Sequence, residues 1–330
     1  MSKNKRAHWR FSSPLSVLQQ RAFLCAEIRR FFAARQVLEV TTPVLSHHGN
    51  TDVHIEMFQT QALLPDHNAA YLRTSPEFFH KRLLASGAGD LFEIARVFRR
   101  GERTPLHHPE FTLLEWYRLD FNLADLMQEV VALVQQLLAA FVQPAIKVTT
   151  LSYQELFQTV VGLDPFSVSD QALHDRCQAH GYSGAALSRT EAFDFLFACV
   201  IQPELSAGQR FTDGLLLHRF PVAMAALAAA DPEQPDRCLR FEFLWRGVEL
   251  ANGYQELTDA VEQRARFVAD NRLRQAADKA QLPLDEHLLA ALDHGLPACS
   301  GVALGLERLL MCLLGLDDLD QVTGFIPENS

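Results

Sequence analysis

The sequence predicts an α+β fold in which a mainly antiparallel sheet is flanked by helices. Residues 91–117 hold two segments of strand-like alternation around a basic, proline-containing loop, which is the pattern of a hairpin. Residues 240–256 predict a second hairpin with its turn at Arg246-Gly247. Long helical patterns occupy 16–35, 123–141 and 258–280. Because hairpins join antiparallel strands, these observations together favour this fold class.

Composition limits the possible functions. With 330 residues, of which 48% are hydrophobic, the chain can bury a sizeable core. A formal net charge of −10 argues against an extended nucleic-acid surface. The longest apolar run, 130–142, is too short to span a bilayer, and no apolar segment follows the basic residues 1–10. We therefore expect neither a membrane span nor a signal peptide.

The cysteine and histidine patterns predict neither disulfides nor zinc. Six cysteines are scattered without a C-x-x-C pair, which is typical of reduced thiols in a cytoplasmic protein. Two histidine doublets, His47-His48 and His107-His108, lack further ligands at metal spacing, and adjacent residues on a strand point apart.

The first third of the chain predicts a long helix at 16–35, with Ser16 available as its cap, and a strand at 37–42 that stops at Pro43. Strands are expected at 53–60 and 71–74, followed by a helix at 78–86. Ser75 and Glu77 lie at the start of that helix. As an ordinary structural feature, Glu77 would simply oppose the helix dipole.

The first hairpin brings chemistry to one face of the sheet. Alternation from Glu110 onward places Phe111, Leu113, Glu115 and Tyr117 on a shared surface. Basic side chains end the first strand and occupy the loop, namely Arg99, Arg100, Arg103, His107 and His108. A cationic loop beside an aromatic ring favours a ligand made of phosphate and a flat base.

The middle of the chain is mostly helical. After the helix at 123–141, residues 151–205 predict several short helices broken at 162–165 and 181, which we interpret as an insertion between strands of the sheet. A strand is expected at 211–220, ending at Pro221. The alanine-rich stretch 223–230 favours a helix or close packing.

The second hairpin is expected to set Glu242 directly opposite Glu249. Facing carboxylates repel unless a cation lies between them, and Mg²⁺ with a polyphosphate supplies one. Past the turn, Asn252, Tyr254 and Glu256 share one strand face, which suits an amine-bearing ligand. A polar sheet surface without function is the alternative reading.

Helices at 258–280 and 284–294 precede a glycine-containing stretch at 300–308. On a strand Gly301, Ala303 and Gly305 share one face, leaving a nearly flat surface that a ligand can approach. Arg308 then opens the next helix.

These motifs, taken in order, resemble those of the class II aminoacyl-tRNA synthetases, in particular the lysyl branch. The helix, strand and proline at 16–43 resemble the first class motif, Phe98-Arg99 with Pro109-Glu110-Phe111 the second, and residues 300–308 the third. The run 249–256 is similar to the Glu-x-x-Asn-Gly-Phe-x-Glu of lysyl enzymes, and 114–118 resembles the paralogous ligases that modify elongation factor P.

This resemblance implies the class II synthetase catalytic core and a set of roles. Arg99 and Arg308 are the implied catalytic residues, with Arg99 on the α-phosphate and adenine held between Phe111 and Arg308. Glu242 and Glu249 are the implied ligands of Mg²⁺. The implied ATP contacts are Arg99, Glu102, His108, Phe111, Glu249, Leu250, Gly305 and Arg308. The implied amino-acid contacts are Ser75, Glu77, Glu115, Tyr117, Asn252, Tyr254, Glu256 and Ala303.

Several positions depart from the lysyl pattern. Glu102 lies one residue late, Leu106 stands for an arginine, and His108 stands for an asparagine. Tyr254 replaces a phenylalanine and Ala303 a glycine.

The expected organisation is one catalytic domain over 1–330, with a helical insertion near 151–205 and no N-terminal anticodon-binding OB domain. The family implies a homodimer through 16–43. Without an OB domain tRNA is an improbable acceptor, so the favoured reaction is ATP-dependent attachment of lysine or β-lysine to a lysine of elongation factor P. The alternatives are a stand-alone core that acts on tRNA or a small amine, and a non-catalytic regulatory paralogue.

Overall fold

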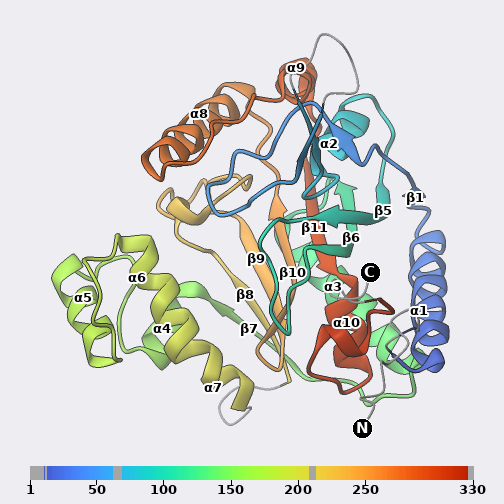
Figure 1. Cartoon of the computed structure of the whole chain (residues 1–330), viewed down its shortest axis with the longest axis horizontal. Coiled ribbons are helices and arrows are strands. Elements are labelled where there is room, and N and C mark those ends of the chain that lie inside the picture. Colours follow the sequence, from blue (N-terminus) through green and yellow to red (C-terminus); the bar gives the residue numbers. More distant parts are fainter. Residues whose placement is uncertain (1–10, 12, 62–68, 208–212, 326–330) are drawn as a thin grey trace, which may run out of the picture.

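A computed structural model describes residues 11, 13–61, 69–207 and 213–325 (Figure 1). Its centre is an eight-stranded sheet in the order β1-β5-β6-β11-β10-β9-β8-β7. Only the outer pairs β1/β5 and β7/β8 are parallel, so the predicted α+β class with a mainly antiparallel sheet is confirmed. The strands are β1 Leu38–Glu39, β5 Leu91–Phe98, β6 Glu110–Leu119, β7 Val148–Ser152, β8 Gly214–His218, β9 Arg240–Trp245, β10 Val248–Gln255 and β11 Cys299–Gly305.

One face of the sheet carries the main core. Helices α1 (Leu15–Ala33), α3 (Leu123–Ala140) and α10 (Leu306–Leu313) cover it, and Trp116, Phe241 and Phe243 fill the space beneath them. A capping box at Asn122 and Asp125 starts α3. Within the described residues α3 alone is long and apolar enough to cross a membrane, but half of it is buried inside the protein, as in a core helix.

Two predictions about the N-terminal region are wrong in detail. Ser16 does not cap α1, because the helix already begins at Leu15 after Pro14 and has no side-chain cap. The strand expected at 37–42 is reduced to β1, and Thr42 beyond it makes side-chain hydrogen bonds with Arg73 and with Glu93 on β5. The basic segment 1–10 lies outside the described residues.

The segment between β1 and α2 forms a small sheet of β2 (Leu45–Ser46), β4 (Ala70–Leu72) and β3 (Gln59–Thr60). The strands predicted at 53–60 and 71–74 are therefore shorter than expected. Asn50 and Asp52 explain much of this difference, because their side chains accept hydrogen bonds from the backbone two residues on and fold 50–54 into turns.

A helical region lies between β7 and β8 and has a core of its own (Figure 1). It consists of α4 Tyr153–Val160, α5 Asp170–Ala179, α6 Arg189–Leu196, a π-helical turn Phe197–Ile201 and α7 Gln202–Ala207. Gly162 and Gly181 both have positive φ, which explains why the helices break there. Residues 211 and 212 of the predicted 211–220 strand lie outside the described residues, and the rest contains β8.

The alanine-rich stretch packs closely and is not a regular helix. It contains only a 3-10 turn, Val222–Met224, followed by Ala228 and Ala230, which form isolated bridges to Glu256 and Cys238. Ala228 is completely buried. Small side chains allow this segment to lie against the sheet at the edge of the cavity described below.

The remaining helices complete the molecule. α2 (Glu77–Ala85), α8 (Ala260–Ala276) and α9 (Glu286–Gly295) gather at one end of the sheet (Figure 1), and a 3-10 turn, Leu319–Gln321, follows α10. Asp259 and Asp285 cap α8 and α9. The predicted helices at 78–86, 258–280 and 284–294 are confirmed apart from their ends.

Candidate active site

The uncovered face of the central strands forms the floor of a cavity of about 610 Å³. Strand β11 runs through the middle of this floor, with Ala303 paired to Glu115 on β6 and to Asn252 on β10. Paired residues of antiparallel strands point to the same face, so these residues form one row across the sheet. Glu93 on β5 and Glu242 on β9 extend that row on either side.

A second row lies one step along the strands. It contains Tyr117, Gly301, Tyr254 and Arg240. A Cβ on Gly301 would lie 2.3 Å from the Tyr117 ring and 2.6 Å from Glu256 Oε1, so only glycine fits there. The predicted flat face of Gly301, Ala303 and Gly305 is confirmed, and it forms a trough between larger side chains.

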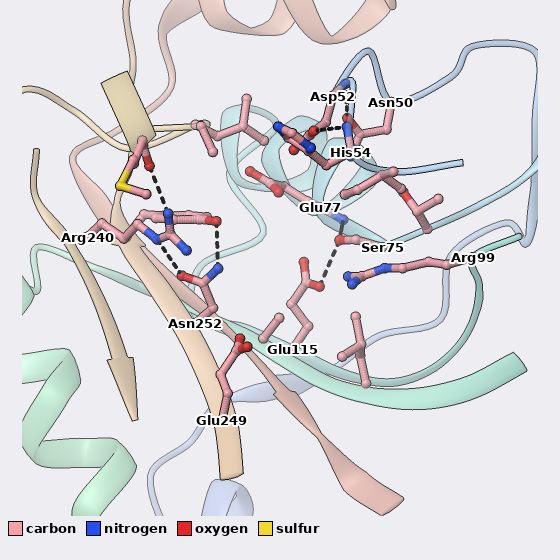
Figure 2. A pocket seen from close by; sticks show the side chains of 18 of the residues that line it. Asn50, Asp52, His54, Ser75, Glu77, Arg99, Glu115, Arg240, Glu249 and Asn252 are labelled. Atoms are coloured by element: carbon pink, nitrogen blue, oxygen red, sulfur yellow. Dashed lines mark hydrogen bonds between the residues drawn. The ribbon is translucent and has the colours of Figure 1, made fainter. Parts of the chain in front are cut away.

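The start of α2 fixes one carboxylate of the floor. Ser75 Oγ donates to Glu115 Oε2 at 2.8 Å and accepts from the Glu77 N–H at 2.9 Å. The Tyr117 hydroxyl donates to Glu115 Oε1 at 3.0 Å. Figure 2 shows Ser75, Glu77 and Glu115 directed into the same space. The sequence thus correctly grouped these four residues, although their ligand stays a prediction.

Lys81 is a residue that the motifs did not identify. Its side chain is 1% exposed, and its Nζ lies 2.7 Å from Glu77 Oε1 and 2.6 Å from Glu256 Oε2. Burial lowers the pKa of Lys81, but the two carboxylates outweigh burial and raise it overall. Burial raises the pKa of Glu77 and of Glu256 despite Lys81. Lys81 lies four positions after Glu77 on α2, a spacing that brings two side chains together on one helix face and could have revealed the pair.

At the opposite side of the floor, Arg240 is a second unpredicted residue. Its guanidinium donates to Glu242 Oε1 at 2.6 Å and to Asn252 Oδ1 at 3.2 Å, and Asn252 donates to the Tyr254 hydroxyl at 3.1 Å. Asn252, Tyr254 and Glu256 all line the cavity, which confirms their predicted common face.

The expected pairing of Glu242 with Glu249 is wrong. Arg246 and Gly247 are both turn residues with positive φ, so Trp245 pairs with Val248. A bulge between Glu249 and Ala251 shifts the register once more, and Glu242 faces Asn252. Glu249 pairs with Leu244, two residues from Glu242, so the two carboxylates share a face diagonally.

These positions fit a divalent cation only in part. Glu249 is 45% exposed and lines the cavity, whereas Glu242 is tied to Arg240. Burial raises the pKa of Glu242 to about 7; Arg240 opposes this effect and Glu249 adds to it. The described residues contain no cluster of three or more metal-ligating side chains. Mg²⁺ commonly uses one or two carboxylates together with phosphate oxygens, so the donor set suits a nucleotide-bound ion.

The hairpin loop borders the other end of the cavity. Arg99 lies over the Phe111 ring, 5.2 Å from its centroid, and among the described residues its buried Nε has no hydrogen-bond partner. Arg308, in the first turn of α10, donates to the carbonyls of Leu106 and Glu249 at 2.9 Å each. Glu102, Leu250 and Gly305 line the same region.

Not every basic residue of this loop faces a polyanion. Arg103 and His108 both contact Asp320, at 3.0 and 2.8 Å, and Arg100 pairs with Glu56. These contacts bind the loop to the C-terminal turn and to the segment before β3. The expectation that all five basic side chains hold one ligand is therefore wrong. Arg99 and His107 line the cavity, where they can face a ligand. His108 also lines the cavity, but its ring is bound to Asp320.

The cavity wall also includes parts that the sequence did not connect with a site. Thr190 and Asp194 come from α6, and Asn50 together with residues 52–55 lines the side towards α8. Figure 2 shows Asn50, Asp52 and His54 above the carboxylates. The helical region thus contributes directly to the site.

Comparisons with known proteins agree with this geometry. A family model described as tRNA synthetases class II (D, K and N) matches residues 2–329. A protein named elongation factor P--(R)-beta-lysine ligase from Mannheimia succiniciproducens is 44% identical over 326 residues, with 98% of each chain covered. Proteins of the same name from Haemophilus influenzae and Klebsiella pneumoniae are each 42% identical, over 327 and 333 residues, with 98% and 99% of this chain and 98% and 100% of the relatives covered.

Proposed function

The chain belongs to the class II tRNA synthetase family of the D, K and N type, and we propose that it is an ATP-dependent ligase that attaches β-lysine or lysine to elongation factor P. One observation supports this most strongly. A single cavity joins a floor rich in carboxylates to an end where Arg99 presents a buried N–H without a partner among the described residues beside Phe111. Carboxylates suit a diamino acid, and the arginine and ring suit a nucleotide.

In the proposed reaction a carboxylate oxygen of the amino acid attacks the α-phosphorus of ATP and pyrophosphate leaves. An amine of the protein acceptor then attacks the acyl carbon and AMP leaves. Arg99 stabilises negative charge on the phosphate, and Phe111 and Arg308 hold adenine. Glu115, Glu77, Glu256 and Asn252 hold the amino acid. Such chemistry depends on positioning and charge neutralisation more than on a side-chain base.

Mg²⁺ would be held by Glu249 with Glu242 and would neutralise phosphate charge. We place the whole reaction in one catalytic domain with α4–α7 as an insertion. The six free cysteines support a reducing, cytoplasmic location. The relatives carry the name elongation factor P--(R)-beta-lysine ligase, which favours elongation factor P over tRNA as the acceptor.

Mass spectrometry of the acceptor tests the transfer step. The protein is incubated with ATP, Mg²⁺ and β-lysine, together with either elongation factor P or unmodified tRNA. We expect one residue of β-lysine on elongation factor P and none on tRNA. Transfer to tRNA alone would contradict the proposal.

Replacement of Ala303 by glycine should shift the preference between the two amino acids. Ala303 lies between Glu115 and Asn252 on the floor, so its methyl group narrows the space beside both polar contacts. An extra carbon in a packed wall costs the poorly fitting ligand about 1 to 3 kcal/mol. In Ala303→Gly, kcat/KM for α-lysine should rise several-fold relative to β-lysine.

The matched control for this experiment is Gly305→Ala. A Cβ there has its closest protein neighbour at 3.7 Å, so the fold accommodates the methyl, and any effect on ATP should be the same for both amino acids and leave the preference unchanged. An unaltered ratio in Ala303→Gly would show that this methyl does not contact the discriminating part of the substrate.

We also infer a homodimer through residues 16–43. Leu15, Leu18 and Phe23 on α1 and Leu38 on β1 are exposed apolar side chains on this side of the molecule. Sedimentation should give a dimer at micromolar concentration, and a monomer would count against this inference.

A further inference from the structure

His80 lies on the buried face of α2, between two carboxylates of neighbouring strands. It is 0% exposed. Its Nε2 is 3.0 Å from Glu93 Oε2, its Nδ1 is 3.7 Å from Glu115 Oε1, and its ring packs edge-on against Tyr117. Glu93 and Glu115 are direct partners across β5 and β6. Like charges at paired positions repel, and His80 is placed to offset that repulsion.

Glu93, which lies on the side of His80 away from the cavity, is fixed by further hydrogen bonds. Glu93 accepts hydrogen bonds from Arg73 at 2.8 Å and from Thr42 at 2.6 Å. Arg73 in turn donates to the carbonyls of Arg96 and Thr42. A buried series of contacts therefore runs from Arg73 through Glu93 and His80 to Glu115, the carboxylate that lines the cavity.

We propose that His80 is a positioning residue for the amino-acid site, which holds the Glu115 carboxylate directed towards an amine of the substrate. This inference rests on the proposed function, because it assumes that Glu115 receives an ammonium group. His80 itself does not line the cavity, so it acts through Glu115. Helix α2 would then supply two groups to the site: the carboxylate of Glu77 and the ring of His80, which orients Glu115.

The surroundings of His80 favour its charged form. Burial lowers the pKa of His80, but Glu115 and Glu93 outweigh burial and raise it above the usual value. Tyr117 from β6 also contacts the ring, and Glu77 and Lys81 lie on α2 itself. Helix α9 packs on α2 through leucines, so it adds no charge to this contact.

The direct test compares His80→Gln with the wild type on three substrates. These are β-lysine and two analogues that lack either the backbone amine or the side-chain amine. For β-lysine, KM should rise about ten-fold with kcat nearly unchanged, as expected when a charge-assisted contact weakens. One of the two analogues lacks the amine that faces Glu115. For that analogue, KM should be the same in His80→Gln and in the wild type. An equal penalty on all three substrates would overturn the proposal, because a general structural defect does not depend on the amine.

The pH profile gives a second readout. Because the folded-state pKa of His80 is raised, its contribution is complete at low pH and is lost as pH rises through that pKa. Wild-type kcat/KM for β-lysine should fall over this range, and His80→Gln should lack this step. An identical step in both proteins would contradict the proposal.

Controls separate this inference from the proposed function. His294→Gln alters an exposed histidine on α9 and should behave as the wild type. If the wild type activates no amino acid, the proposed function fails. If it is active and His80→Gln matches it, only the role of His80 fails.

If His80→Gln does not fold, Glu93→Gln replaces it in the test, because Glu93 lies one contact further from the cavity. Glu93→Gln should show the same substrate-dependent rise in KM, and a variant without that rise would refute the positioning role of His80.

Discussion

Replacing Lys81 with methionine should lower the free energy of unfolding by about 3 to 5 kcal/mol, because removal of one partner leaves buried charge uncompensated. Lys81 is 1% exposed and lies within 2.7 Å of both Glu77 and Glu256. Without it, the two carboxylates face each other in the cavity wall. Chemical denaturation monitored by circular dichroism measures the change.

The loss should also depend on pH. Burial already raises the folded-state pKa of Glu77 and Glu256 in the wild type, where Lys81 opposes it; without Lys81 both pKa values rise further, so the folded variant binds more protons than the folded wild type. As pH rises above the ordinary carboxyl pKa, the free energy of unfolding should therefore fall more in the variant than in the wild type. Lys279→Met is the matched control, because Lys279 pairs with Glu56 at a partly exposed position and should cost about 1 kcal/mol at most. Equal losses in both variants would show that the Lys81 cluster has no special importance.

Replacing Arg99 with glutamine should reduce kcat for amino-acid activation by about 100- to 1000-fold, the usual cost of removing a donor aimed at developing negative charge. The backbone N–H of Arg99 donates to the Pro109 carbonyl at 2.9 Å, and its side chain lies over Phe111. These contacts direct the guanidinium towards the cavity, as Figure 2 shows. Stopped-flow measurement of a single turnover isolates this step.

Arg100→Gln is the control for Arg99. Arg100 is adjacent in sequence but 63% exposed, and it pairs with Glu56 outside the cavity. Its replacement should change kcat little. Similar losses in both variants would indicate that the loop acts through its general charge and not through one positioned arginine.

The sequence was most informative where a strand period could be counted. The common face of Phe111, Leu113, Glu115 and Tyr117, and that of Gly301, Ala303 and Gly305, follow from alternation alone. The same counting failed in the second hairpin for two reasons. Arg246 and Gly247 both belong to the turn, so Glu249 pairs with Leu244, and a bulge after Glu249 then adds one residue to that strand without a signal in the sequence.

Contacts between distant segments could not be predicted. His80 and Lys81 belong to a helix whose buried face is defined only when it docks on β5 and β6. Asp320 lies 212 residues from His108, and nothing in either segment indicates that they meet. Similarly, the short helices of 151–205 gave no sign that α6 would border the cavity.

In the proposed reaction the carboxylate-lined floor selects an amino acid with two amines, which the enzyme then joins to AMP. ATP–pyrophosphate exchange measures this step without an acceptor. With Mg²⁺ we expect exchange in the presence of β-lysine and, more weakly, α-lysine, but none with norleucine, which has the same chain length and lacks the side-chain amine. Exchange that is equally fast with norleucine, or absent with every amino acid, would contradict the account.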